Sequence, residues 1–407
     1  MTITCGIDWA ERHHDVALVD GDGTTMAKKR IDTGFGGFTE LVALIAEYGG
    51  EPATVAVAIE TDKNLVVAAL QAGGFTVYAI NPRAVARYRE RSSQAGGKSD
   101  PGDAIVLANI LRTDRHVHRP LPQISELGLA VKALARQHQE AIWARQLTVN
   151  RLRSLLFEFY ANALEAFPNL THKAALEVLG AAPTPRDGEK LTHKRVVTLL
   201  RRSGRGDRPG LAEAIVAHLH QPALRQPPRV EAALGHAVIG LVKTVETMQE
   251  SIAKLEIAMV TELDQHPSAE LLRGVPGLGA VLAARVLAEV GDDRSRFATA
   301  DGLRAFAGTA PITRASGKSK VVRTRYVKNK RLTDACHWWA FASITKSDGS
   351  RAHYDRRRAA GDSHNAALRN LANKLLGRLW WCLVHDQEWS EEAAWPDATQ
   401  RPEAAAA

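Results

Sequence analysis

A long apolar seam in the middle of the chain places the strongest constraint on its fold. Eight apolar residues follow one another in alternating steps of four and three. This heptad spacing is typical of a long helix that buries one face against another helix. The partner is either a helix of the same chain or a second copy, so a coiled-coil homo-oligomer (dimer or tetramer) is one of two open interpretations. The seam consists of Leu234, Val238, Leu241, Val245, Met248, Ile252, Leu255 and Met259.

Composition divides the 407 residues into successive parts. The first part alternates strand and helix patterns, the second is helical, and the third begins at a glycine-rich turn and ends in two amphipathic helices. A segment rich in Pro, Gly and Arg interrupts the helical part, and an Ala/Pro-rich tail is expected to be disordered. The predicted domains are 1–115 (α/β), 116–265 (helical coiled-coil region with an insert at about 171–228), 266–395 (mainly α) and 396–407 (tail).

The first part predicts a mixed sheet with helices on its faces. Three β-type runs come first, as in an antiparallel meander, and βα alternation follows. The fourth run, TVAVAIE, is almost wholly apolar, as expected of a strand buried on both faces. Strands are predicted over 3–10, 14–21, 26–33, 54–60 and 76–81, and helices over 35–48, 64–72 and 100–111.

Charge is distributed unevenly along the chain. The net charge is +8, yet residues 1–64 carry 11 acids against 5 Lys and Arg. The segment from Gly302 to Thr333 holds nine Lys and Arg and no acid. An acidic first part followed by a basic remainder favours a metal site on one and a phosphate-binding surface on the other.

Cysteine usage and hydropathy indicate the compartment. The three cysteines are too few and too dispersed for a disulfide framework or a metal knuckle, which favours a reducing cytoplasm. No apolar run approaches the ~20 residues of a membrane span, so no membrane partner is expected. We expect a cytoplasmic protein.

Four acids form the first candidate site. Asp8 interrupts the apolar run CGIDWA, and Glu60 ends the buried run TVAVAIE. A carboxylate in a core strand is costly unless it is paired or binds a cation. Asp100 and Asp103 lie three residues apart at the start of a helix, where an N-cap and a first-turn acid are the plainer interpretation. Together the four acids indicate a site for Mg²⁺, which prefers oxygen ligands and substrate phosphates.

The run VPGLGAVLAARVLAEVG, from Val275 to Gly291, is the second candidate. A tight glycine turn followed by a small-residue helix resembles a helix-hairpin-helix. Gly277 and Gly279 would let backbone N–H groups approach a DNA phosphate. The competing interpretation is a packing turn between two helices.

The third candidate is the basic segment 306–331. Its cations would neutralise phosphates, which makes binding dependent on salt. Ser316 lies in an Ala-Ser-Gly turn and Ser319 follows three residues later; a serine there is far more often a turn residue than a nucleophile. No GxSxG elbow supports hydrolase chemistry. The candidate nucleic-acid-binding residues are Arg314, Lys318, Lys320, Arg323, Arg325, Lys328, Lys330 and Arg331, with Gly277 and Gly279.

These candidates, in this order, resemble the IS110 (and IS1111) insertion-sequence transposases and the Piv-type invertases. The resemblance covers about residues 3–115 and 266–385. It is carried by GIDWAERHHDVALVD, VAVAIET, KSDPGDAIVLANIL, VPGLGAVLAARVLAEVG and LRAFAGTAPITRASGKSK followed by KNKR. The insert at 171–228 looks longer than this family's pattern.

The resemblance implies a bacterial transposase or recombinase that acts on the nucleoid. Its first domain would be RuvC-like and RNase H-like, with Asp8, Glu60, Asp100 and Asp103 holding Mg²⁺. Its last domain would carry a nucleophilic serine, which maps to Ser316, and would form a phosphoserine bond with double-stranded donor and target DNA. The resemblance also implies a structured guide (bridge) RNA from the element's non-coding end and tetramers with composite sites.

Three other function classes stay open at this stage. A RuvC-like, metal-dependent junction nuclease would use the acids alone and form no covalent intermediate. An actin-like sugar kinase or ATPase would share the acid of the first strand, but DWAERHHD offers no glycine-rich phosphate loop. A non-catalytic nucleic-acid-binding protein would leave Asp8 without a role.

Overall fold

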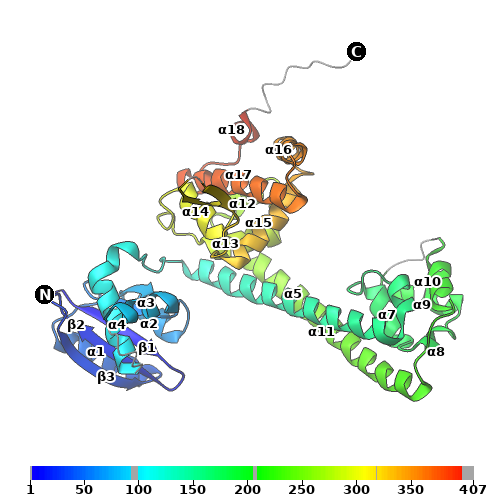
Figure 1. Cartoon of the computed structure of the whole chain (residues 1–407), viewed down its shortest axis with the longest axis horizontal. Coiled ribbons are helices and arrows are strands. Elements are labelled where there is room, and N and C mark those ends of the chain that lie inside the picture. The colour runs from blue at the N-terminus through cyan, green and yellow to red at the C-terminus, as the bar shows by residue number, and fades with distance from the viewer. Residues whose placement is uncertain (1, 93–99, 205–208, 318, 397–407) are drawn as a thin grey trace, which may run out of the picture. The chain divides into compact units, whose positions relative to one another are not determined.

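The computed structural model describes residues 2–92, 100–204, 209–317 and 319–396. The chain forms two compact units, Met1–Gln123 and Ile124–Ala407 (Figure 1). Each unit has its own cores. None of the described helices is long and apolar enough to cross a lipid bilayer.

The first unit is built on a five-stranded mixed sheet with the strand order β3-β2-β1-β4-β5. β1 pairs antiparallel with β2, and β2 with β3, as the predicted meander requires. β4 and β5 extend the sheet in parallel from the other edge of β1, as the βα alternation indicated. The strands are β1 (Thr4–Trp9), β2 (His13–Val19), β3 (Thr25–Asp32), β4 (Ala56–Ile59) and β5 (Thr76–Ala79).

Two layers of helix cover the two faces of this sheet. Cys5 and Ile7 of β1 pack with α1 and α2 in one core. Because side chains alternate along a strand, the other face is left to α3 and α4, which pack on Ala56, Ala58 and Tyr78. Helix α3 was not predicted. The helices are α1 (Phe35–Glu47), α2 (Leu65–Ala72), α3 (Pro82–Ser92), α4 (Asp100–Asp114) and the short η1 (Arg115–Val117).

A long helical hairpin forms the frame of the second unit. Helices α5 (Glu126–Phe159) and α11 (Pro228–Asp264) lie side by side and antiparallel (Figure 1). One end buries Val131 against Met259, and the other end places Leu152 in one core with Val238. Four of the eight seam residues, Val238, Val245, Ile252 and Met259, are buried within one chain and the other four are half-buried, which favours the intramolecular interpretation over the second copy.

Replacing Val245 and Ile252 together with lysine is expected to destabilise the second unit. Both side chains are buried in the single chain, so each lysine would place an unpaired charge between packed helices at a cost of several kcal/mol. The melting temperature should fall by about 10 °C or more. The control Ile257→Lys changes an exposed residue of the same helix and should leave it unchanged. A double variant that melts like the wild type but sediments as a smaller species would show that the seam joins two copies.

Each end of the hairpin carries its own helical core. At one end, the insert forms short helices joined by loops, and these helices pack on α5 and α11 around Leu156, Leu176 and Leu199. The predicted tail lies outside the described residues apart from Pro396. The helices at this end are α6 (Ala161–Ala166), α7 (Lys173–Ala181), α8 (Pro185–Gly188), α9 (His193–Arg202) and α10 (Leu211–Leu219).

At the other end, a helical core is built around the fully buried Trp339. It contains both predicted amphipathic helices, α15 and α17, and the unpredicted α16 between them. A two-stranded hairpin, β6 and β7, projects from this core. The elements are α12 (Ala269–Arg273), α13 (Ala280–Val290), α14 (Ala300–Ala307), β6 (Ile312–Ser316), β7 (Ser319–Arg323), α15 (Lys330–Ser343), α16 (Asp348–Ala359), α17 (His364–His385) and α18 (Glu391–Ala394).

Candidate active site

Three of the four predicted acids line one pocket of the first unit. Asp8, Glu60 and Asp103 surround a polar space of about 400 Å³ on the sheet face that α3 and α4 cover. We call it the acid pocket. Asp15 and Arg89 line it too, and the sequence analysis missed both. The fourth predicted acid, Asp100, is the first residue of α4, but its side chain lies outside the described residues.

Strand register explains how these acids come together. Ile7 pairs with Ile59 in the parallel ladder of β1 and β4, so Asp8 and Glu60 leave the sheet side by side. Asp8 also faces Asp15 across the antiparallel ladder of β1 and β2, which puts both on one face. The signal for Asp15 was present in the sequence, since it too is an acid next to an apolar β run.

A close approach of helix and strand brings Asp103 to this edge. A Cβ atom on Gly6 would lie 2.0 Å from the carbonyl oxygen of Ala104 and 2.6 Å from the nitrogen of Ala108. Only glycine therefore permits α4 to lie this close to β1. One turn of α4 then places Asp103 beside the end of the strand, where it is 6% exposed.

Two arginines engage two of the acids. Arg89, on the pocket-lining face of α3, forms an ion pair with Asp103. Arg30 binds Asp15 through two hydrogen bonds, of 3.1 Å from Nε and 2.8 Å from Nη2. Across the described part of the chain, no three His, Cys, Asp or Glu side chains lie close enough together to hold a metal ion in this arrangement. The oxygen donors suit Mg²⁺ in kind, and Arg89 would have to leave Asp103 for that carboxylate to become a ligand.

Ser316 lies in a hairpin rather than in an isolated turn. It is the last residue of β6 and pairs across the ladder with Ser319, the first residue of β7. Both serines are exposed, and Gly317 between them has open space around it. The two rival nucleophiles thus face each other across the end of one hairpin.

Register also places two cations on the face of the hairpin that carries Ser316. Arg314 lies two residues before Ser316 on β6. Arg323 of β7 pairs with Ile312, which lies four residues before Ser316. Because residues i, i+2 and i+4 share a face with their cross-strand partners, both arginines lie on the Ser316 face of the hairpin. Both are exposed. This serine therefore sits on a cationic, accessible face. Lys318 and the side chain of Lys320 lie outside the described residues.

The remaining predicted cations differ in their surroundings. Arg331 forms an ion pair with Glu140 and lies over the ring of Trp143 at 5.8 Å, so α5 holds it. The stem of Lys328 packs against Gly308. Arg325 is half-buried and Lys330 is exposed. Among these four, Lys330 is the most available to a ligand.

Asn329 anchors the segment that follows the hairpin, a role that no motif in the sequence predicts. Its side chain caps α15 at the nitrogen of Leu332 and donates a 2.7 Å hydrogen bond to Glu289. Burial by itself would raise the pKa of Glu289. The hydrogen bonds and charge of Arg136, together with Asn329, outweigh burial and lower that pKa. Glu289 therefore stays ionised and fixes the segment that follows the hairpin to α13.

The glycine turn joins α12 to α13 and has an internal packing role. Gly277 has a φ of +77°, and a Cβ atom there would lie 2.5 Å from the backbone nitrogen of Ser343 in α15. Gly277 is thus required by conformation and by packing on α15. Gly279 caps α13 and has open space beside it, so it is the better placed of the two for a phosphate.

Comparison with known proteins gives consistent matches to mobile-element proteins. Residues 5–161 match a transposase model of the IS110 DEDD type, and residues 269–355 match the model for the transposase IS116/IS110/IS902 family. The chain is 48% identical to the mini-circle protein of Streptomyces coelicolor named as a transposase for IS117, over 98% of each chain. It is 28% identical to the 42 kDa protein of insertion element IS900 from Mycobacterium paratuberculosis, over 93% of this chain and 94% of that one.

Proposed function

This chain belongs to the IS116/IS110/IS902 family of transposases, enzymes that cut and rejoin DNA, and we propose that it does so by serine transesterification assisted by Mg²⁺. One observation carries the proposal for the serine. Ser316 lies exposed at the end of a hairpin, on the face that also presents Arg314 and Arg323. Trapping of a covalent protein–DNA adduct tests it.

In the proposed reaction, Ser316 Oγ attacks a phosphodiester. A new O–P bond forms on the 5′ side, the P–O3′ bond breaks, and the serine proton ends on the departing 3′ oxygen. Arg314 and Arg323 would stabilise the negative charge that builds on the phosphate oxygens. Because the phosphoserine keeps the energy of the broken bond, a 3′-hydroxyl of the partner strand can reverse the step and join new ends.

We further propose that the first unit is an RNase H-like, RuvC-like domain. The strand order β3-β2-β1-β4-β5 supports this, with an acid on the first strand and another at the end of the adjacent parallel strand. Asp8, Glu60, Asp103 and Asp100 would hold Mg²⁺, with Arg89 displaced from Asp103. Bound Mg²⁺ polarises phosphoryl oxygens and stabilises the charge of the transition state.

The basic surface is proposed to bind double-stranded DNA and a structured guide RNA. The exposed Arg314, Arg323 and Lys330 support a polyanionic ligand, and the guide RNA is added from the family resemblance alone. A homo-oligomer is also proposed on that resemblance, and the buried seam gives it no support. Gel-filtration of the protein with and without RNA from the element's non-coding end tests both proposals.

Replacing Lys318, Lys320, Arg323 and Arg325 with alanine is expected to weaken nucleic-acid binding. Loss of four phosphate contacts should flatten the plot of log affinity against log salt by about three to four units. Fluorescence anisotropy across a salt series measures this slope. The control replaces Arg201 and Arg202, two exposed arginines at the end of α9, and should leave the slope unchanged. An unchanged slope in the four-residue variant together with a flatter slope in the Arg201 and Arg202 variant would place the binding surface on the insert.

A further inference from the structure

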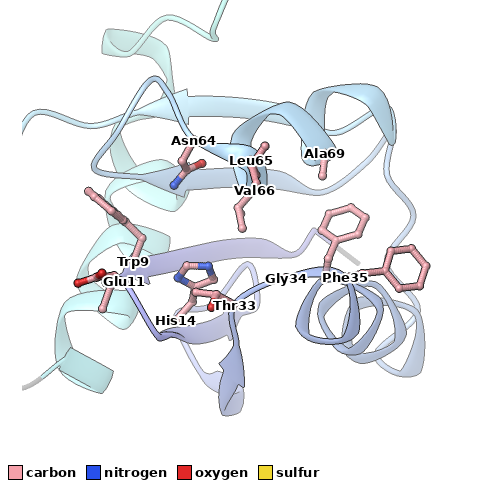
Figure 2. Close-up of a pocket in the computed structure, with 12 residues that line it drawn as sticks. Trp9, Glu11, His14, Thr33, Gly34, Phe35, Asn64, Leu65, Val66 and Ala69 are labelled. Carbon is pink, nitrogen blue, oxygen red and sulfur yellow. The ribbon is translucent and has the colours of Figure 1, made fainter.

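A second pocket of the first unit lies on the opposite sheet face from the acid pocket. It has a volume of about 460 Å³ and is bounded by the starts of α1 and α2, the end of β1 and the start of β2. Figure 2 shows His14 in its middle, with Trp9 towards one end and Phe35 towards the other. We call it the apolar pocket. None of the roles described above uses it.

Exposed apolar side chains concentrate at this pocket. Phe35 is 87% exposed, Leu65 88% and Trp9 44%. Within the described part of the first unit, only one further large apolar side chain, Val117, is exposed. Such gathering of unprotected apolar surface is a feature of binding sites rather than of an ordinary protein surface.

His14 carries an unpartnered polar atom at the wall of the apolar pocket. Its side chain lines the pocket, the residue is only 4% exposed, and its Nδ1 atom has no hydrogen-bond partner among the described residues. Burial lowers the pKa of His14. This effect outweighs the hydrogen bond with the backbone of His13, which by itself would raise that pKa. A buried ring nitrogen without a partner is costly, so a ligand towards which the ring turns this nitrogen and with which it forms a hydrogen bond would be favoured.

The apolar pocket adjoins the acid pocket at the end of β1. Trp9 and Ala10 line both pockets. Trp9 pairs with His14 across the ladder, and Asp8 pairs with Asp15. Successive residues of β1 therefore point alternately to the apolar pocket and the acid pocket. A DNA strand with one of its phosphates at Asp8 would therefore have a neighbouring base within reach of Trp9.

The lining selects a base rather than a phosphate. Among the described residues that line it, only Glu11 has a charged side chain, and this carboxylate repels anions. Flat apolar faces and one hydrogen-bonding edge match a nucleobase, since every base has a π-face to stack. An apolar side chain of a protein partner would leave His14 Nδ1 without a hydrogen bond.

We propose that the apolar pocket holds one unpaired nucleobase of a DNA strand, packed between Trp9, Phe35 and Leu65 and hydrogen-bonded to His14 Nδ1. The acids of the acid pocket repel the phosphates of a DNA strand. The apolar pocket would hold that DNA strand next to the acids by binding one of its bases. This inference concerns binding by the first unit and does not depend on Ser316 being the nucleophile.

Two duplexes with equal numbers of phosphates test the proposal. One carries a single unpaired thymidine, and the other an abasic residue at the same place. Anisotropy titrations with the full chain are done in EDTA, so no strand is cut and the result is independent of catalysis. Wild type should bind the thymidine duplex about tenfold more tightly, as expected for one stacked base. Equal binding would overturn the proposal.

Variants locate the effect. Phe35→Ser and Leu65→Ser alter exposed side chains, so they should fold normally, lose most of the tenfold preference and bind the abasic duplex as before. Val117→Ser, also exposed but outside the pocket, should keep the preference. A preference seen only with the matching RNA duplexes would overturn the assignment to DNA. Unchanged preference with altered self-association in Phe35→Ser would assign the pocket to a protein partner instead.

Discussion

Ser316→Ala is expected to abolish the covalent protein–DNA adduct and to leave nucleic-acid binding unchanged. The substitution removes one exposed hydroxyl from the end of a hairpin, so neither the core nor the arginines beside it should change. A nicked suicide duplex prevents the reverse reaction and lets a phosphoserine accumulate in the wild type. Denaturing electrophoresis measures the adduct, and its yield should fall by at least about 10²-fold, since no other nucleophile replaces the hydroxyl.

Ser319→Ala is the matched control, because Ser319 pairs with Ser316 and is also exposed. It should still form the adduct, and Ser316→Cys should keep weak activity because sulfur is nucleophilic. A labelled peptide that maps to Ser319 would transfer the role across the hairpin and preserve the mechanism. Cleaved DNA with free ends and no adduct on any serine would instead establish the metal nuclease without a covalent intermediate.

The sheet of the first unit could be predicted because its pattern is local. Alternation along 3–10 and 14–21 and the fully apolar run 54–60 each determine a strand by themselves. A carboxylate among those residues is costly wherever the strand pairs, which is why Asp8 and Glu60 could be selected before any register was known. Both line one pocket in the structure, while their role as site residues stays a prediction.

Features that depend on tertiary pairing could not be predicted in the same way. Arg89 meets Asp103 only because α3, a helix with polar composition, packs beside α4. The heptad seam is equally compatible with a partner in the same chain or in another, and only the length and position of α5 decide between them. The two serines of the basic segment become a facing pair only when β6 and β7 form their ladder.

Asp8→Asn is expected to abolish metal-dependent strand transfer without loss of stability. Asparagine keeps the size of the side chain and removes one negative charge from a pocket that also contains Glu60 and Asp15. The fold should melt at the same temperature or slightly higher in EDTA, because repulsion among the acids is relieved. Turnover should fall by about 10²-fold or more, since the stabilisation of charge in the transition state is worth several kcal/mol.

Melting curves with and without Mg²⁺ separate loss of metal binding from other defects. Mg²⁺ should raise the melting temperature of the wild type, because a ligand that binds only the folded state stabilises it, and should have no such effect on Asp8→Asn. Asp15→Asn is the matched control: it faces Asp8 in the same pocket, but Arg30 already occupies its carboxylate, so the response to Mg²⁺ should survive. Asp103→Asn should lose that response as Asp8→Asn does, with an additional cost from the arginine left in the pocket. If Asp8→Asn keeps both its thermal response to Mg²⁺ and its turnover, the acids are structural and the metal must lie elsewhere.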